Sequence, residues 1–270
     1  MTTLARTRTR LGTTALGAAV LAAALLLRPA AARAEDLVVS HYADLIYGAP
    51  WAVALKKGFL KAHGLDVTGF MSSDGGTTIR NMMAGGVPYA ETALSAAVGM
   101  DPATVTRQSL GTMGGGLTAL AQGAVDTAPE PEPLLSRNEA KYRILFSTAD
   151  LLPPITQHVG VASRDFLRDH PDKVRALIEA RRDGVAFIYA HPDKAAEIEA
   201  DVLDIPVPVA KRAMQRLVAA HYWSDGRLDY DAMARSIAGM HAIGALPTAT
   251  VDWAAMVDGS GLPSDLRSKR

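Results

Sequence analysis

The first third of the chain alternates short apolar runs with segments of helical periodicity. Residues 37–41 begin with three apolar residues, and we predict a buried parallel strand there. A helix is predicted next: Pro50 suits its first turn, and Gly58 ends it. The pattern then predicts a second strand over 65–71, a helix over 75–84 and a third strand over 89–92. This β-α-β-α-β order is typical of the start of a doubly wound α/β lobe.

The middle of the chain repeats this alternation less regularly. Three alternating prolines exclude a central strand or a helix interior over 129–133, so we predict a rigid loop there. Around that loop the pattern predicts a strand at 105–110, helices at 114–121 and 134–141, and strands at 142–147 and 157–163.

From residue 164 onward the pattern is helical. A long helix is expected to begin at His170-Pro171, with its apolar residues on one stripe. Arg181 falls on the same stripe, and we expect its stem to pack there while its charge reaches water. These C-terminal helices, residues 164–270, are expected to pack on the preceding lobes, with further helices near 193–203, 209–220, 231–243 and 252–257.

The N-terminal segment has the layout of a secretory signal peptide. Three arginines precede an uncharged run over 11–27, and residues 32–34 form a small-x-small cleavage site. An uncleaved membrane anchor is the alternative, but a run of 17 residues is short for a span of about 20. We therefore expect residues 1–34 to be removed and the protein to be periplasmic, without a lipid anchor because the chain has no cysteine.

Removal of residues 1–34 would leave an acidic chain. The segment holds five arginines and no acidic residue, so the remainder has 23 basic and 28 acidic side chains and a net charge near −5. This balance argues against a nucleic-acid partner, which needs a basic face. The absence of cysteine excludes disulfides, thiol catalysis and cysteine-based metal sites.

A short pattern occurs twice, at residues 84–90 and again 38 positions later at 122–128. Each copy follows a helix that opens on glycines, so the repeat predicts two similar α/β lobes. We expect lobe one over 35–98 and lobe two over 99–163. A cleft between two lobes is a common place for a small-molecule ligand.

Several motifs, in order along the chain, resemble those of one family. Residues 49–67 are similar to its hallmark, a helix carrying Lys-Gly-Phe followed by Gly-Leu-Asp-Val at the next strand. Residues 74–78, 122–126 and 170–174 add to the likeness. The chain resembles periplasmic substrate-binding proteins of the nitrate, sulfonate, taurine and thiamine-pyrimidine-precursor type. The resemblance implies a two-lobed α/β fold, a small-molecule ligand, and a membrane permease and ATPase complex of an ABC importer as partner.

The spacing of the repeat departs from that family. Its members have roughly two more β/α units, each of about 30 residues, between the two copies. We therefore expect an incomplete second lobe. An internally deleted paralogue, an error in the sequence and a smaller working variant all remain as explanations.

The sharpest local candidate is the helix start at Gly75, Gly76, Thr77 and Thr78. A helix N-terminus offers unpaired N–H groups and a partial positive charge, which suit a sulfonate, carboxylate or phosphate. The alternative is an N-cap without a ligand.

Aromatic side chains supply the next candidates. Tyr42 and Tyr47 follow the first strand, at the edge where open α/β sheets bind ligands, and could hold a ring or an alkyl chain. His41 and Trp51 are weaker candidates because both could instead pack in the core.

Two carboxylates, Glu91 and Glu132, occupy matching places in the two copies of the repeat. Facing each other, they could bind an amine, an amidine or a pyrimidine edge; alternatively each is solvated or paired with an arginine. Gln157 is a further ligand candidate, with Thr156 and His158 as lesser ones.

Neither a catalytic site nor a metal site is predicted. The seven histidines form no i, i+4 pair, and the sequence has no P-loop lysine and no Gly-x-Ser-x-Gly elbow. We expect a monomeric, non-enzymatic binding protein without cofactor, for a small anionic or heteroaromatic ligand. Two other functions are weighed: an internally deleted or repurposed paralogue with impaired binding, and an enzyme acting on a thiamine precursor. The resemblance argues against the enzyme, because such relatives carry a cysteine-rich motif.

Overall fold

The computed structural model describes residues 37–39, 42, 45–85, 87–93, 113–125 and 127–267. The chain divides into two units, Met1–Ala34 and Glu35–Arg270, and all described residues belong to the second. The expected signal peptide, the strand expected at 105–110 and His41 lie outside the described residues. None of the described helices combines the length and the apolar character that a membrane span requires.

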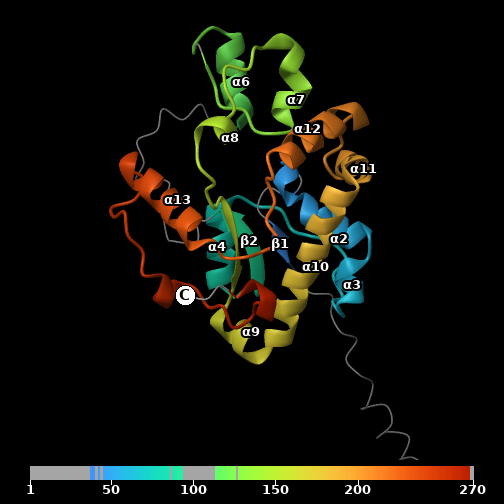
Figure 1. Cartoon of the computed structure of the whole chain (residues 1–270), viewed down its shortest axis with the longest axis vertical. Coiled ribbons are helices and arrows are strands. Elements are labelled where there is room, and N and C mark those ends of the chain that lie inside the picture. Colours follow the sequence, from blue (N-terminus) through green and yellow to red (C-terminus); the bar gives the residue numbers. More distant parts are fainter. Residues whose placement is uncertain are drawn as a thin grey trace, which may run out of the picture. The chain divides into compact units, whose positions relative to one another are not determined.

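Three strands form one sheet, in the order β1-β2-β3 (Figure 1). β1 (Val38–Val39) is parallel to β2 (Tyr89–Ala93), and β3 (His158–Ala162) is antiparallel to β2. Ala90 lies opposite Val38 on one side and Val161 on the other. The sheet confirms the three strands predicted at these positions. β3 pairs with β2 although its place in the sequence falls in the range expected for lobe two.

The strand predicted at 65–71 is wrong in extent. Only Met71 bridges to β1, through a hydrogen bond from its amide to the Leu37 carbonyl (2.8 Å) and one from the Val39 amide to its own carbonyl (3.0 Å). Leu65 and Val67 are buried while Asp66 and Thr68 are exposed, which is the alternation that suggested a strand. The alternation shows only which side chains pack inward. An extended backbone can bury alternate side chains in this way without pairing with a neighbouring strand.

The first helix begins where the proline predicts. In α2 (Ala49–Lys56) Pro50 lies in the first turn, and Gly58 has a φ of 75°, the left-handed conformation that ends a helix and favours glycine. A short helix not foreseen from the sequence, α3 (Phe59–Ala62), follows directly. The next helix, α4 (Gly75–Met83), confirms the prediction for 75–84.

The C-terminal part is helical, as predicted. Its longest helix, α10 (Pro171–Ala190), packs along α2. Their backbones approach closely at Gly184, where an added Cβ would lie 2.2 Å from the Pro50 carbonyl oxygen. The remaining elements are α9 (Arg164–Asp169), α11 (Pro192–Val202), α12 (Val207–Ala219), α13 (Tyr230–Ala242), α14 (Trp253–Met256) and η4 (Ser264–Leu266).

Two apolar clusters share α2 and α10. One joins these helices to α11 and α12, and the other joins them to the sheet and to residues 60–67. Trp51 and Leu177 are buried in the second cluster, whereas Val53 and Ile188 are buried in the first. Opposite sides of the same two helices therefore hold the C-terminal helices and the sheet together.

The middle of the chain contains only helices and extended segments among its described residues. Helices predicted at 114–121 and 134–141 are confirmed as α6 (Met113–Ala121) and as α7 (Leu134–Asn138) followed by η3 (Glu139–Lys141). The strand predicted at 142–147 is wrong, because that segment pairs with no described strand before α8 (Thr148–Leu151) begins. Its apolar pattern is compatible with a strand, but the pattern does not determine whether a second strand lies beside it to form hydrogen bonds.

Candidate functional site

A buried ion pair lies where the sheet meets α10. Arg181 Nε donates to Glu91 Oε2 at 2.7 Å, and Trp51 Nε1 donates to the same oxygen at 2.9 Å. The Glu91 side chain is 6% exposed and that of Arg181 16%. Arg181 Nη1 also donates to the Ser224 carbonyl at 3.1 Å. The expectation that Arg181 reaches water is therefore wrong: a buried carboxylate on β2 holds its guanidinium inside.

The charges around Glu91 fix its protonation state. Burial alone would raise the pKa of this carboxyl, but the Arg181 guanidinium, His158 and two hydrogen bonds hold the pKa below its ordinary value. Glu91 is therefore an anion at neutral pH, and Arg181 balances its charge.

Aromatic and amide groups adjoin this pair. The rings of Tyr47 and His158 lie 4.2 Å apart between centroids, and the Tyr222 hydroxyl donates to Gln157 Oε1. Burial and the Glu91 charge raise the pKa of the Tyr222 phenol, so it is a neutral hydrogen-bond donor. The Glu91 charge therefore acts on Tyr222, and His158 acts on the Glu91 carboxyl. We call the six residues Tyr47, Glu91, Gln157, His158, Arg181 and Tyr222 the Glu91 cluster.

The topology explains why these residues meet. η1 (Ile46–Gly48), which carries Tyr47, follows β1, and Glu91 lies on the parallel strand β2. β3 runs in the opposite direction, so Gln157 and His158 at its start reach the end of β2, where His158 pairs with Ala93. Carboxyl ends of parallel strands are the usual ligand edge of an open α/β sheet. Tyr47, Glu91 and Gln157, expected from the sequence to bind ligand, are thereby brought together.

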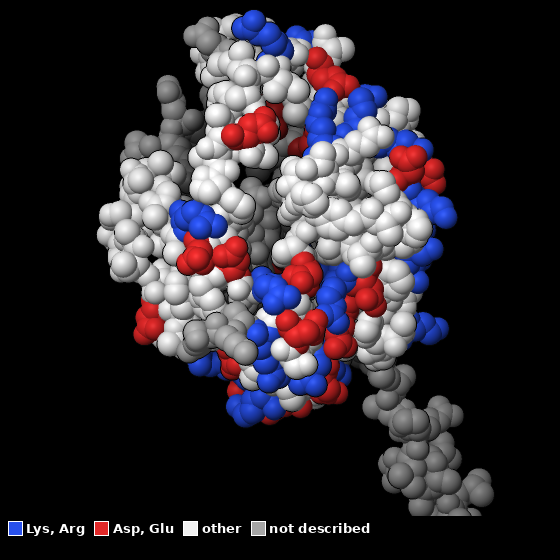
Figure 2. Space-filling model, in the orientation of Figure 1, with Lys and Arg blue, Asp and Glu red and all other residues white. Residues whose placement is uncertain are grey.

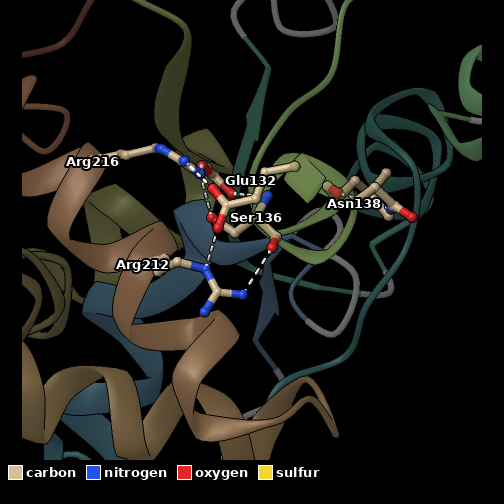
Figure 3. Close-up of polar contacts among 7 residues, drawn as sticks. Glu132, Ser136, Asn138, Arg212 and Arg216 are labelled. Carbon is tan, nitrogen blue, oxygen red and sulfur yellow. Dashed lines mark hydrogen bonds and ion pairs between the residues drawn. The ribbon is translucent and has the colours of Figure 1, made fainter. Parts of the chain in front are cut away.

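Glu132 belongs to a different cluster, drawn in Figure 3. Its carboxylate accepts from the Ser136 amide and from Arg216 Nη1, each at 3.1 Å. Arg216 also pairs with Glu139, as does Arg212, so the arginines of α12 hold α7 and η3. An open depression of about 400 Å³ beside these arginines is lined by Arg212, Gln215, Arg216 and Ala219. Glu132 therefore has the arginine pairing that the sequence left open as the alternative to ligand contact.

The glycine-rich start of α4 is capped from within the chain. Asp74 accepts from the Thr77 amide at 2.9 Å and from the Thr77 hydroxyl at 2.6 Å, and Arg80 donates to that hydroxyl at 2.7 Å. The Thr78 side chain is buried and donates to the Asp74 carbonyl at 2.9 Å. Hydrogen bonds from Thr77 lower the pKa of Asp74, so the cap is an anion. The N-cap alternative is present, and ligand contact at Gly75, Gly76, Thr77 and Thr78 stays a prediction.

The other residues predicted from the sequence contact the protein's own side chains and backbone. Tyr42 is partly buried, and its ring lies 5.1 Å from that of Phe70. Trp51 is fully buried, as its alternative reading predicted, and supports Glu91. The Thr156 carbonyl accepts from the Ser236 hydroxyl at 2.7 Å.

Sequence reasoning missed Arg181 and Tyr222 as site residues. The only signal for Arg181 was its position on an otherwise apolar stripe, since a charge there needs either water or a buried partner. Tyr222 gave no such signal, because its contact with Gln157 joins residues 65 positions apart.

α9 follows the other end of β3, where Ala162 pairs with Tyr89, and the surface charges there are mixed in sign. Figure 2 shows acidic and basic side chains interspersed over α9 and the adjoining part of α10. In this area Arg168 pairs with both Asp165 and Asp169. Among the described residues, no group of three or more histidine, aspartate or glutamate side chains has the arrangement of a metal site.

The family comparison supports the sequence motifs. The family model described as NMT1/THI5 like matches residues 90–195, a range that includes Glu91 and Arg181. It also includes two of the motifs, at 122–126 and 170–174, and confirms the predicted family resemblance. No curated protein matches the chain.

Solved structures share the fold. The periplasmic aliphatic sulphonate-binding protein SsuA from Escherichia coli aligns with a TM-score of 0.63 and 12% identity, over 83% of this chain and 96% of its own. The alkanesulfonate-binding protein SsuA from Xanthomonas axonopodis pv. citri, bound to MOPS, gives 0.60 and 11%, over 86% and 99%. A Candida albicans protein described as having the generic periplasmic binding protein fold gives 0.54 and 15%, over 87% and 98%. The α/β periplasmic-binding-protein fold predicted from the sequence is thus confirmed.

Proposed function

We propose that this chain is an extracytoplasmic solute-binding protein, because it combines an NMT1/THI5-like segment with a periplasmic-binding-protein fold. It is not an enzyme, and it delivers a small ligand to an ABC importer. The signal peptide expected at residues 1–34 would place it in the periplasm, where the permease and ATPase complex receives the ligand.

The Glu91 cluster carries this proposal. It combines a buried, balanced ion pair with two aromatic side chains, an imidazole and an amide at the ligand edge of the sheet. Ligand sites of this kind are lined by apolar and aromatic surface with a few placed polar groups. An ion pair used only to join β2 to α10 would need none of these neighbours.

The ligand we infer is anionic or heteroaromatic. Among the described residues, Arg181 Nη2 has no hydrogen-bond partner, so it can donate to a sulfonate or carboxylate. The Tyr47 and Tyr222 rings provide faces for a planar ring, and Gln157 and Glu91 provide acceptors for its amino groups. Both ligand classes can therefore use the same cluster.

Binding by purified residues 35–270 tests the function. We expect a thermal-shift panel of an alkanesulfonate, taurine, nitrate and a hydroxymethylpyrimidine to identify at least one stabilising ligand. With that ligand, calorimetry should show binding at least tenfold weaker, about 1.4 kcal/mol, in Arg181→Lys and in Tyr222→Phe. Arg168→Lys and Tyr230→Phe are the matched controls, since Arg168 makes exposed ion pairs and Tyr230 contacts Trp253.

Two outcomes would count against this function. Either no member of the panel stabilises correctly folded protein, or both cluster variants bind as tightly as their controls. Formation of a product from a thiamine precursor without added transporter would instead support the alternative that the protein is an enzyme.

A second candidate is an internally deleted paralogue that no longer closes around its ligand. The observation that favours it is the exposed apolar segment at 142–147, for which the described residues supply no neighbouring strand. Small-angle scattering distinguishes the two, because hinge closure reduces the radius of gyration when ligand is added. A ligand that stabilises the protein but leaves this radius unchanged would favour the deleted paralogue.

A further inference from the structure

A long apolar segment follows η3 and is open to solvent. Residues 143–155 are all exposed, thirteen in succession. Single exposed apolar side chains are ordinary, but a contiguous group of them marks an interaction surface. Six large apolar side chains of this segment are between 48% and 63% exposed: Ile144, Leu145, Phe146, Leu151, Leu152 and Ile155.

Residues 142–147, where this exposed stretch begins, have a backbone that resembles an unpaired edge strand; we refer to these six residues as the segment. Tyr142 at its start (φ −133°, ψ 152°) and Ser147 at its end (φ −98°, ψ 137°) are both extended. Within the described part of the chain, residues 143–146 form no backbone hydrogen bond. Free N–H and C=O groups beside apolar side chains are a template for pairing with another strand.

The order of side chains makes the segment complementary to itself. In extended backbone Ile144 and Phe146 lie on one face and Leu145 on the other. Antiparallel pairing about a two-fold axis at Leu145 would place Ile144 of each copy opposite Phe146 of the other. An aromatic side chain opposite a β-branched one is a favourable cross-strand pair. Because of the two-fold symmetry, the Ile144–Phe146 pair would form twice in the dimer.

The charges at the two ends select the antiparallel direction. Lys141 and Arg143 precede or begin the segment, and Asp150 follows it in α8. Neither Arg143 nor Asp150 has an ion-pair partner among the described residues. Antiparallel pairing brings the basic end of one copy towards the acidic end of the other, whereas parallel pairing would place like charges together.

We propose that residues 142–147 pair, antiparallel, with the same segment of a second copy of this chain, forming a two-fold dimer. This replaces the expectation of a monomer, and it does not depend on whether the Glu91 cluster binds a solute.

The oligomeric state of residues 35–270 tests the dimer. Sedimentation velocity should show a dimer for the natural sequence, with a dissociation constant raised at least 100-fold in Ile144→Asp and in Phe146→Asp. These side chains are exposed, so circular dichroism should stay unchanged. Ile243→Asp is the control, because Ile243 is 66% exposed in another part of the chain and its replacement should leave the dimer intact.

Cross-linking tests the register. The chain has no cysteine, so Leu145→Cys introduces a single thiol that would face its own copy across the two-fold axis, within reach of a disulfide. Mild oxidation should give a covalent dimer for Leu145→Cys and none for Met83→Cys, whose native side chain is 83% exposed.

Three results would overturn the proposal. They are a monomeric natural sequence, a dimer unaffected by Ile144→Asp and Phe146→Asp, and cross-linking of Leu145→Cys no greater than that of Met83→Cys. A monomer whose Leu145→Cys thiol also resists maleimide would show that the chain covers this segment itself.

Discussion

At the scale of single residues, two buried glutamates differ in what surrounds their carboxyl groups. Glu91 receives hydrogen bonds from Arg181 and Trp51, which keep it ionised inside the protein. Glu199 on α11 is 1% exposed, and its Oε1 has no hydrogen-bond partner. Burial therefore raises the pKa of Glu199 well above its ordinary value. One carboxyl contributes stability as an anion and the other only as a neutral acid.

Replacing Glu199 should stabilise the protein increasingly as the pH rises. The pKa of Glu199 is higher in the folded protein than in the unfolded chain. Its contribution to the free energy of unfolding is therefore fully present below the unfolded pKa and is lost as the pH rises through the folded pKa. Glu199→Met removes that loss and should raise the free energy of unfolding at pH 8 by roughly 1–3 kcal/mol. Urea unfolding at pH 5 and pH 8 measures the difference; a variant whose advantage does not grow with pH contradicts the assignment.

Sequence reasoning at this scale found residue types but not their partners. Glu91 was selected for its place in a repeat, and Gln157 and His158 for their place before a strand. Their partners, Arg181 and Tyr222, lie 90 and 65 positions away along the chain. Such contacts depend on how α10 and the later loop pack on the sheet, which local patterns do not encode.

At the scale of elements, two segments with the same apolar signal have different outcomes. Residues 65–71 pack Leu65 and Val67 into a core but form only one bridge to β1, and residues 142–147 pack against no described strand. Helices were predicted more accurately, because hydrogen bonds within the segment, caps and prolines define them locally. Strands need a neighbour, and the neighbour is set by topology.

The packing of α2 on α10 should be sensitive to one methyl group. At Gly184 an added Cβ would lie 2.2 Å from the Pro50 carbonyl oxygen, so Gly184→Ala must push the helices apart. We expect it to cost at least about 2 kcal/mol of unfolding free energy. Gly239→Ala in α13 is the matched control, because its Cβ would meet nothing within 4 Å, and it should stabilise by up to about 1 kcal/mol. Equal stability of the two variants in urea would show that this helix contact is loose.

At the scale of the whole molecule, the motifs predicted the fold better than the element pattern did. The order of glycine turns and helix starts indicated the family, and the NMT1/THI5-like match bears this out. The sheet of the described residues has only three strands, one of them contributed by residues 158–162. The 38-residue spacing of the repeat led us to expect an incomplete lobe two, and that expectation stays a prediction.

If that segment joins two copies, the stability of the molecule must depend on its concentration. A dimer that forms only in the folded state gains stability by mass action. A hundredfold increase in protein concentration should add about 1.4 kcal/mol per protomer and raise the Tm of the natural sequence by about 3–5 °C.

Calorimetric scans of residues 35–270 at two concentrations measure this shift. Ile144→Asp should melt at one temperature at both concentrations, because its folded form would be monomeric, and Ile243→Asp should follow the natural sequence. A Tm of the natural sequence that is independent of concentration would mean that residues 142–147 do not pair between copies, whatever the Glu91 cluster binds.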